Sequence, residues 1–262
     1  MSEKKPNICD ALDFVFLSPA NLKQGLSRKP ESALEEEVVT AYIDTFAGEP
    51  WNEYMKCADC GKEYSEKESK TVLGDENARC KNSKCTSLTS SQRVILKPYY
   101  DRDEVKKEIL GEAVSCQGFQ GLAAVLYGKD VTGVAWGYEL PKNKDIHTVR
   151  MTLVRPMIES KGIELSKPFY AAEIFVPPAF QGMGVGTELA YARFLLAQKA
   201  GYDQVFFRTK NTDMLLVYKK LFGEGNTREL FADPVKDTPW YFVEMNYLRD
   251  HREGRRQKPL AV

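Results

Sequence analysis

An apolar segment that runs through a glycine-rich turn into an amphipathic segment constrains this chain most. Residues 169–176 (FYAAEIFV) are rich in aromatic and β-branched side chains, which predicts a strand, and two prolines follow it. Residues 188–200 (ELAYARFLLAQKA) have helical periodicity. The glycines of the stretch 181–187 (QGMGVGT) therefore lie where a strand gives way to a helix.

A glycine turn in this position suits an anion such as a pyrophosphate. Glycine has no Cβ, so backbone N–H groups can approach the anion, and the start of a helix offers unpaired donors and a positive dipole end. The pattern also fits a tight turn without a ligand. A P-loop is excluded because no Gly-Lys-Ser/Thr ending is present. The dinucleotide fingerprint is excluded because it needs its first glycine directly after the strand and an acidic residue at the end of a later strand.

These residues resemble the GNAT superfamily of acyl-CoA N-acyltransferases. Gln181, Gly184 and Gly186 match the family pattern Gln/Arg-x-x-Gly-x-Gly/Ala. The resemblance is specific over 169–247. It implies an α+β fold, with a mixed, mostly antiparallel central sheet that is flanked by helices. The elements expected in family order are a strand at 11–17, a helix at 33–46, a hairpin at 123–140, a strand at 204–209, a helix through 216–223 and a strand near 241–247.

Three further local predictions concern helices. Ser32 and Glu35 have capping-box spacing and are expected to start the helix at 33–46. A second helix is expected over 101–110. Residues 147–162 are ambiguous, and we expect a helix that begins near Pro156, because proline suits the first helical position.

The length and composition predict one main domain with an insert. A chain of 262 residues with 43% hydrophobic content can bury a sizeable core. We divide it into the first strand and helix at 1–50, a four-cysteine insert at 51–94, the rest of the acetyltransferase domain at 95–248, and a basic, disordered tail at 249–262.

The charge balance gives no reason to expect a nucleic-acid partner. Lysine and arginine number 37 and aspartate and glutamate 37, so the net charge is zero. No apolar run approaches the roughly 18 residues that a membrane span needs, and residues 1–6 lack the apolar core of a signal peptide. We therefore expect a cytoplasmic protein without membrane partners. The sequence leaves a homodimer open.

Four of the six cysteines have the spacing of metal ligands. They form two short-spaced pairs, Cys57 with Cys60 and Cys80 with Cys85. Four thiolates favour a structural Zn²⁺ in a small ribbon or knuckle, because the intervening polar segment cannot form its own apolar core. An iron–sulfur centre, two regulatory disulfides and four unligated thiols are the alternatives.

The resemblance implies acetyl-CoA as cosubstrate. The strand before the turn would bind the pantetheine arm through backbone groups while it splays from its neighbour, and the turn would hold the pyrophosphate. Asn211 would hold the pantetheine arm, or only cap the following helix, for which Thr212 and Asp213 compete. The implied cofactor residues are Ile174, Phe175, Val176, Gln181, Gly182, Met183, Gly184, Val185, Gly186, Thr187 and Asn211.

The resemblance also places two catalytic groups. Glu173 stands among apolar strand residues, where a desolvated carboxylate has a reason to show a raised pKa and to serve as general base. Tyr218 falls where the family has a tyrosine that donates its proton to the coenzyme A thiolate. The alternatives are an ion-paired strand residue and a packed helix aromatic. Glu139 and Glu244 are weaker candidates for the base.

The acceptor is expected to be an amine of unknown size. The resemblance nominates Trp51, Asn52, Trp136 and Tyr170, although core packing also explains each of them. The cysteine insert lies at the same loop, so it either shapes the acceptor pocket or recruits a macromolecule.

The sequence therefore predicts an N-acetyltransferase that moves an acetyl group directly from acetyl-CoA to a primary amine in a ternary complex. The alternative is a catalytically inactive acyl-CoA-binding or zinc-ribbon interaction module. A cysteine mechanism is disfavoured because its histidine would have to be His147 or His251, and the latter lies in the basic tail.

Overall fold

A computed structural model describes residues 8–47, 55–64, 66–85, 94–141, 149–233 and 238–250 of the chain. Its α-helices are α1 (Pro19–Leu22), α2 (Leu34–Phe46), α3 (Glu66–Leu73), α5 (Arg102–Ser115), α6 (Val149–Glu159), α7 (Val185–Lys199) and α8 (Thr212–Phe222). Its strands are β1 (Leu12–Phe16), β2 (Gly25–Leu26), β3 (Lys29–Ala33), β4 (Met55–Cys57), β5 (Glu63–Tyr64), β6 (Leu96–Pro98), β7 (Gln120–Leu126), β8 (Asp130–Glu139), β9 (Pro168–Phe175), β10 (Gln204–Arg208), β11 (Arg228–Ala232) and β12 (Pro239–Glu244). Short 3₁₀ turns are η1 (Ile8–Ala11), η2 (Pro178–Phe180), η3 (Glu224–Asn226) and η4 (Met245–Tyr247).

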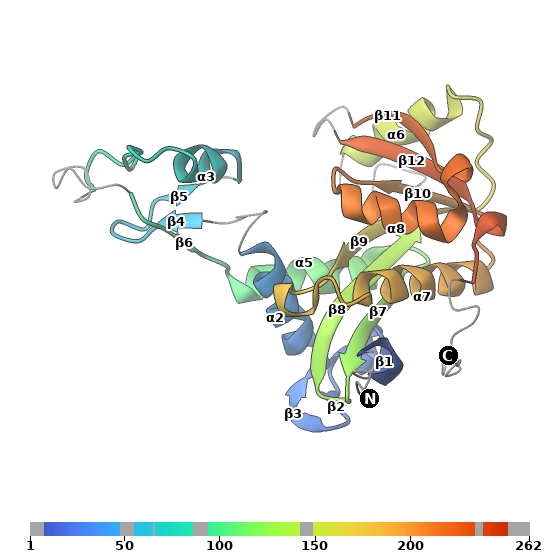
Figure 1. Cartoon of the computed structure of the whole chain (residues 1–262), viewed down its shortest axis with the longest axis horizontal. Helices are drawn as coiled ribbons and strands as arrows, with labels where there is room; N and C mark the ends of the chain where they lie inside the picture. The colour runs from blue at the N-terminus through green and yellow to red at the C-terminus, as the bar shows by residue number, and fades with distance from the viewer. Residues whose placement is uncertain are drawn as a thin grey trace, which may run out of the picture.

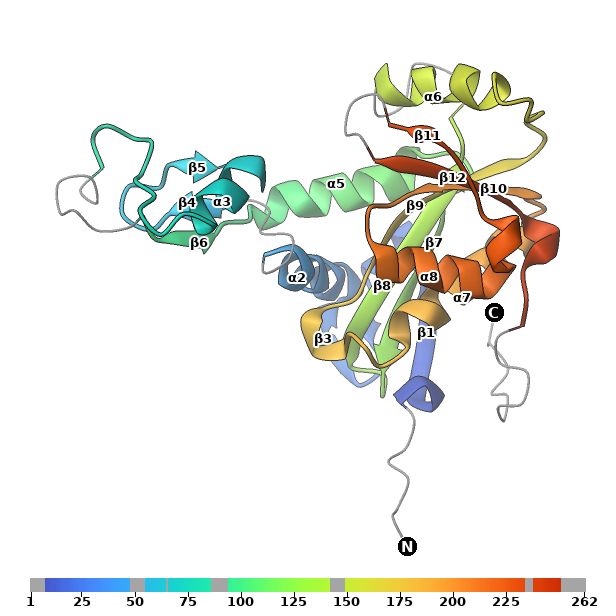
Figure 2. The same ribbon diagram turned by 45° about the horizontal axis from the view of Figure 1, so that its top comes forward.

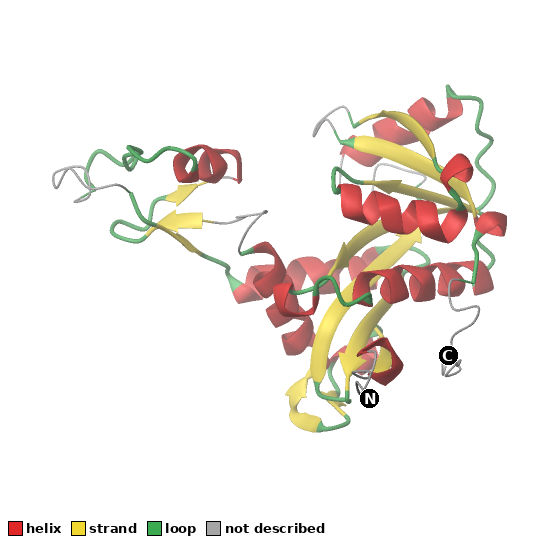
Figure 3. Ribbon diagram, in the orientation of Figure 1, coloured by secondary structure: helices red, strands yellow, loops and turns green. Residues whose placement is uncertain are grey.

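One large sheet organises the main domain. Seven strands lie in the order β1-β7-β8-β9-β10-β12-β11. All neighbouring pairs are antiparallel except β9 and β10, which are parallel. Helices lie on both sides of this sheet (Figure 3). The mixed, mostly antiparallel sheet with flanking helices confirms the fold class expected from the sequence.

The two faces of the sheet are covered by different helices. On one face, α2, α5 and α6 bury side chains such as Val38, Ile109 and Ile158 against Tyr170 and Trp240 of the sheet. On the other face, α7 and α8 cover the sheet (Figure 1), and their buried residues fall into two clusters. The apolar run of the β7–β8 hairpin is buried along most of its length because both faces are covered.

Several local predictions were wrong. The capping box is not formed, because Ala33 is the N-cap of α2 without a side-chain bond, while Ser32 Oγ donates to Glu37 at 2.5 Å. Pro156 lies inside α6, which begins at Val149, so proline does not start that helix. The β2–β3 pair and β11 were not expected from the sequence.

The four cysteines belong to a separate small module, which we define as residues 55–98. Its sheet has the order β5-β4-β6, and α3 packs beside it. Because β6 pairs with β4 through Leu96–Pro98, this sheet extends past residue 94, where the sequence analysis places the end of the insert. Figures 1 and 2 show the module projecting from the main domain, to which β6 connects it through α5.

Among the described residues, no helix combines the length and apolar character that a membrane crossing requires.

Candidate active site

The glycine turn joins η2 to the start of α7. Gly182 and Gly184 have φ values of +73° and +86°, in the left-handed region that favours glycine. Gly184 is the N-cap of α7 and offers no capping side chain. Among the described residues, the backbone N–H groups of 182–186 donate to no backbone carbonyl. The turn therefore presents a set of unpaired donors at a helix N-terminus, which suits a phosphate.

Replacing Gly184 by valine is expected to weaken acetyl-CoA binding by about 10–100-fold, because each lost charge-assisted hydrogen bond costs that order of affinity. Valine disfavours a φ of +86°, so the turn has to shift, and its Cβ would also make a tight contact of 3.2 Å with Cys9 Sγ. Isothermal titration with acetyl-CoA measures the effect. Gly201→Val is the matched control, since Gly201 also has a φ of +86° but lies beyond the far end of α7. Full affinity in Gly184→Val would mean that the turn is only structural.

Two polar side chains make hydrogen bonds at the ends of loops near the site, Gln181 in the glycine turn and Asn211 before α8. Gln181 Nε2 donates to the Val176 carbonyl at 2.9 Å and so ties the end of the strand to the turn. Asn211 Oδ1 accepts from the N–H groups of Asp213 and Met214 at 2.9 and 3.2 Å. Asn211 is thus the N-cap of α8, and neither Thr212 nor Asp213 takes that position.

β9 separates from β10 just before the glycine turn. The parallel pairing comprises Gln204 with Pro168, Val205 with Phe169 and Phe206 with Tyr170. Beyond Tyr170, no described residue of β9 pairs with β10, although β10 pairs with β12 as far as Arg208. The strands thus open along 171–175, and the edge of β9 there can bind an extended ligand arm. The cofactor role of Ile174, Phe175 and Val176 at this opening stays a prediction.

A β-bulge in β9 lies beside the opening. Trp136 pairs with Glu173 and Tyr138 with Tyr170, so β9 has one residue more than β8 between these pairs. Gly137 lies opposite the bulge, where an added Cβ would be 2.4 Å from the Tyr170 carbonyl oxygen. Glycine at this position lets the two backbones approach.

Glu173 lies on the face of the sheet that α2 and α5 cover. It pairs with Trp136, and paired residues of antiparallel strands point to the same face. Its Oε1 accepts from the N–H of Ile174 at 3.2 Å, so the carboxylate lies against the opened strand. The Ile174 N–H is one of the groups that the sequence analysis assigns to the cofactor.

Tyr218 lies on the opposite face, in α8. Its side chain is buried, and its ring makes an edge contact with Phe207, at 4.3 Å between centroids. Phe207 directly follows the last β10 residue that pairs with β9. The predicted base and acid therefore flank the opened part of β9 from its two faces.

Arg193 joins these two groups, and the sequence analysis did not identify it. Its guanidinium donates to the Glu173 carbonyl at 2.7 Å, to the Trp136 carbonyl at 3.0 Å and to the Tyr218 hydroxyl at 2.7 Å. The available signal was its place in the helix, because Arg193 interrupts the apolar i, i+4 series of Leu189 and Ala197.

The described acceptor candidates, Trp136 and Tyr170, are both buried. Trp136 Nε1 donates to Glu112 of α5 at 2.5 Å, and Tyr170 accepts a hydrogen bond from Arg208 Nε at 3.1 Å. Burial and the negative charge of Glu112 raise the pKa of Tyr138 far above its usual range, so the phenol of Tyr138 stays protonated near neutral pH. Glu112 was not singled out in the sequence. Trp51, Asn52 and His147 lie outside the described residues.

Cys116 does not supply an alternative nucleophile. Burial, and then the charge of Glu112, raises the pKa of its thiol to about 12. The thiolate is the reactive form of cysteine, so a thiol that stays protonated near neutrality is a weak nucleophile.

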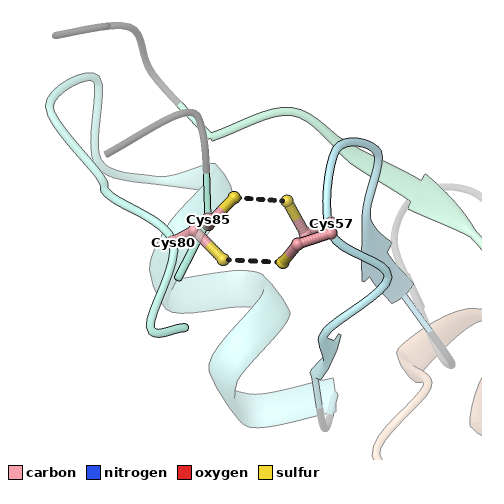
Figure 4. Close-up of side chains that lie close together, drawn as sticks. Cys57, Cys80 and Cys85 are labelled. Carbon is pink, nitrogen blue, oxygen red and sulfur yellow. Dashed lines mark hydrogen bonds between the residues drawn. The ribbon is translucent and has the colours of Figure 1, made fainter. Parts of the chain in front are cut away.

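The four predicted metal ligands come together in the cysteine module (Figure 4). The Sγ atoms of Cys57, Cys60, Cys80 and Cys85 all lie within 4.8 Å of one another. Cys57 and Cys85 are 3.7 Å apart at sulfur, and Cys60 and Cys80 are 3.5 Å apart. A tetrahedral Zn²⁺ with Zn–S bonds of about 2.3 Å requires sulfurs about 3.8 Å apart, so the four thiols fit this ion.

The surroundings of the sulfurs also suit a cation. The backbone N–H of Lys62 bonds to Cys60 and, as the leading cause, lowers the pKa of this thiol to about 6. Burial raises the pKa of Cys57 to about 12, and a bound ion would reverse this by stabilising the thiolate. Tyr64 donates to Cys80 Sγ at 3.2 Å and so supplies an outer hydrogen bond to one ligand.

Comparisons with known proteins identify the fold. No protein-family model matches the chain, and no curated protein matches its sequence. Arylalkylamine N-acetyltransferase 2 from Aedes aegypti is similar in structure, with a TM-score of 0.50 and 15% identity over 90% of this chain and 99% of that chain. PaiA N-acetyltransferase from Thermoplasma acidophilum, solved with coenzyme A, has a TM-score of 0.42 and 11% identity over 89% and 98%. A GNAT-family protein from Desulfovibrio desulfuricans has a TM-score of 0.37 and 15% identity over 55% and 80%.

At 15% identity, the likeness to the mosquito protein establishes the fold and nothing finer. Nearly the whole of that chain is matched, so the likeness extends beyond the strand–turn–helix motif. The chain thus has the fold of this N-acetyltransferase, and its glycine motif resembles that of the GNAT acyltransferases.

Proposed function

We propose that this chain has the GNAT acyltransferase fold and is an acetyl-CoA-dependent N-acetyltransferase acting on a primary amine. The observation that supports this proposal most is the opening of β9 from β10 directly before the glycine turn, whose backbone N–H groups at 182–186 donate to no described backbone carbonyl. The pantetheine arm of acetyl-CoA would bind along 171–176, and its pyrophosphate would bind the N–H groups of the turn at 181–187.

The residues beside the opening supply the two proton transfers. Glu173 accepts the proton of the amine, directly or through a water, from the face that α2 and α5 cover. A backbone N–H at the opened strand would stabilise the oxyanion that develops on the acetyl carbonyl. Tyr218 donates its phenolic proton to the departing coenzyme A sulfur from the opposite face.

Trp136 and Tyr170 border the acceptor side in this proposal. They share with Glu173 the face of the sheet opposite to Tyr218. The acceptor amine would therefore reach the thioester from the face that also carries Glu112, which accepts a hydrogen bond from Trp136. The buried aromatic rings favour an amine with an apolar stem.

The cysteine module is part of the proposal as a structural zinc site. Its four thiolates leave no open coordination position, so the ion would stabilise the fold of the module rather than react. Its described residues lie apart from the opening between β9 and β10 in Figures 1 and 2, so we give it no part in acetyl transfer itself.

The protein would act in the cytoplasm.

Initial-rate kinetics test direct transfer. Because the amine attacks the thioester in a ternary complex, double-reciprocal plots at several fixed acceptor concentrations are expected to intersect. Parallel lines, which indicate a covalent acetyl-enzyme, would contradict the proposed mechanism. Binding of acetyl-CoA without transfer to any acceptor would favour a module that binds acyl-CoA without turnover.

A further inference from the structure

Arg193 is a buried cation whose role is not explained by its packing. Its side chain in α7 has an exposed fraction of 0%. Its three bonded oxygens, on Trp136, Glu173 and Tyr218, are neutral in the free protein. Its Nε has no hydrogen-bond partner among the described residues. Burying a charge with neutral partners only is costly, and an apolar side chain at this helix position would avoid the cost.

The bond between Arg193 and Tyr218 fixes which group is the donor. A guanidinium donates and never accepts, so the phenolic oxygen of Tyr218 must accept from Nη2, at 2.7 Å. The proton of Tyr218 is therefore directed away from Arg193. Edge contacts with the rings of Phe207 and Phe194 hold the tyrosine in this orientation. A phenol held in this way is prepared to donate.

We propose that Arg193 is a positioning residue that keeps Tyr218 oriented as proton donor and stabilises the phenolate left after transfer. This inference rests on the proposed acetyltransferase function. When the amine nitrogen attacks the acetyl carbon, the carbon–sulfur bond breaks and its electron pair moves to sulfur. Tyr218 gives its proton to that sulfur and becomes a phenolate facing Arg193. Glu173 takes a proton from the amine, and solvent exchange restores both groups.

Arg193 also holds the bulged strands. Nη1 bonds to the carbonyls of Trp136 and Glu173, which pair across the β8–β9 bulge. Removing the guanidinium therefore has two effects, one through the strands and one through Tyr218. Only the second effect depends on the phenolic hydroxyl, and a double-mutant cycle separates the two.

The cycle compares Arg193→Met and Tyr218→Phe, singly and together, by kcat and by the dissociation constant of acetyl-CoA. With Tyr218 present, Arg193→Met is expected to lower kcat by about 10–100-fold, the value of a hydrogen bond to a charged group. In the Tyr218→Phe background, the same change is expected to lower kcat by less than about threefold. Arg193→Lys, which keeps a charged donor, is expected to recover most of the loss.

Equal losses in both backgrounds would overturn the inference, because Arg193 would then act through the strands alone. Thermal melting checks that each variant folds, and Arg193→Gln replaces the methionine variant if that chain does not. If the wild type transfers acetyl groups and the cycle is additive, only the role of Arg193 fails. If the wild type binds acetyl-CoA but acetylates no amine, the proposed function fails and this inference with it.

Discussion

Glu173→Gln is expected to lower kcat by about 10²–10⁴-fold, the usual contribution of a positioned general base. Glutamine has nearly the same shape and still offers an oxygen to the Ile174 N–H, which the carboxylate binds at 3.2 Å. It cannot take a proton from the amine. Acetyl-CoA affinity should therefore stay nearly unchanged, while the acidic limb of the pH–rate profile disappears because no carboxylate has to be deprotonated.

Two carboxylates provide matched controls for this experiment. Glu244 is exposed on β12, and Glu139 lies at the end of β8, away from the opening of β9. The Glu244→Gln and Glu139→Gln variants are expected to keep the wild-type rate and pH profile. A Glu173→Gln enzyme whose pH–rate profile matched that of the wild type would refute the base role.

Removal of the predicted metal should unfold the cysteine module. We expect metal analysis to find about one zinc per chain, because the four sulfurs form one closed tetrahedral site. Cys57→Ala should lose the metal and the hydrogen-exchange protection of residues 55–85, since a structural zinc contributes about 10–16 kcal/mol to the folding of comparable small domains. A strong chelator should produce the same loss in the wild type.

The main domain should survive this treatment, because its sheet and helices form their own hydrophobic clusters without the module. The hydrogen-exchange protection of β7, β8 and β9 in the same samples shows whether the main domain stays folded. Cys116→Ala is the control for cysteine content, since Cys116 lies in the core of the main domain and is expected to leave the zinc content unchanged. A stable, metal-free chain with four titratable thiols in the module would contradict the zinc assignment.

The parts of the site that the sequence predicted are those encoded in short spacing. The glycine pattern needs only a strand before it and a helix after it, and the cysteine pairs need only their separation. Arg193 could not be assigned in this way, because its partners on β8, β9 and α8 come together only in the folded sheet. The same holds for Glu112, which meets Trp136 across the α5–β8 contact.

Local propensity failed where other contacts of the folded chain decide the structure. The spacing of Ser32 and Glu35 fits a capping box, yet Ser32 pairs with Glu37 and α2 begins without a side-chain cap. Pro156 suits a helix start, but α6 continues through it and buries Ile158 in the core that Tyr170 and Trp240 share. The burial of such a face can outweigh the preference of a single residue.

The most direct test of the acetyltransferase proposal is coenzyme A thiol release from acetyl-CoA in the presence of different amines. The panel should include polyamines, aminoglycosides, arylalkylamines, amino acids, and lysine or N-terminal peptides, with Tyr218→Phe and Glu173→Gln as reference variants. The account predicts release that depends on one class of amine and falls sharply in both variants. Tight binding of acetyl-CoA with no release above background for any amine would contradict it.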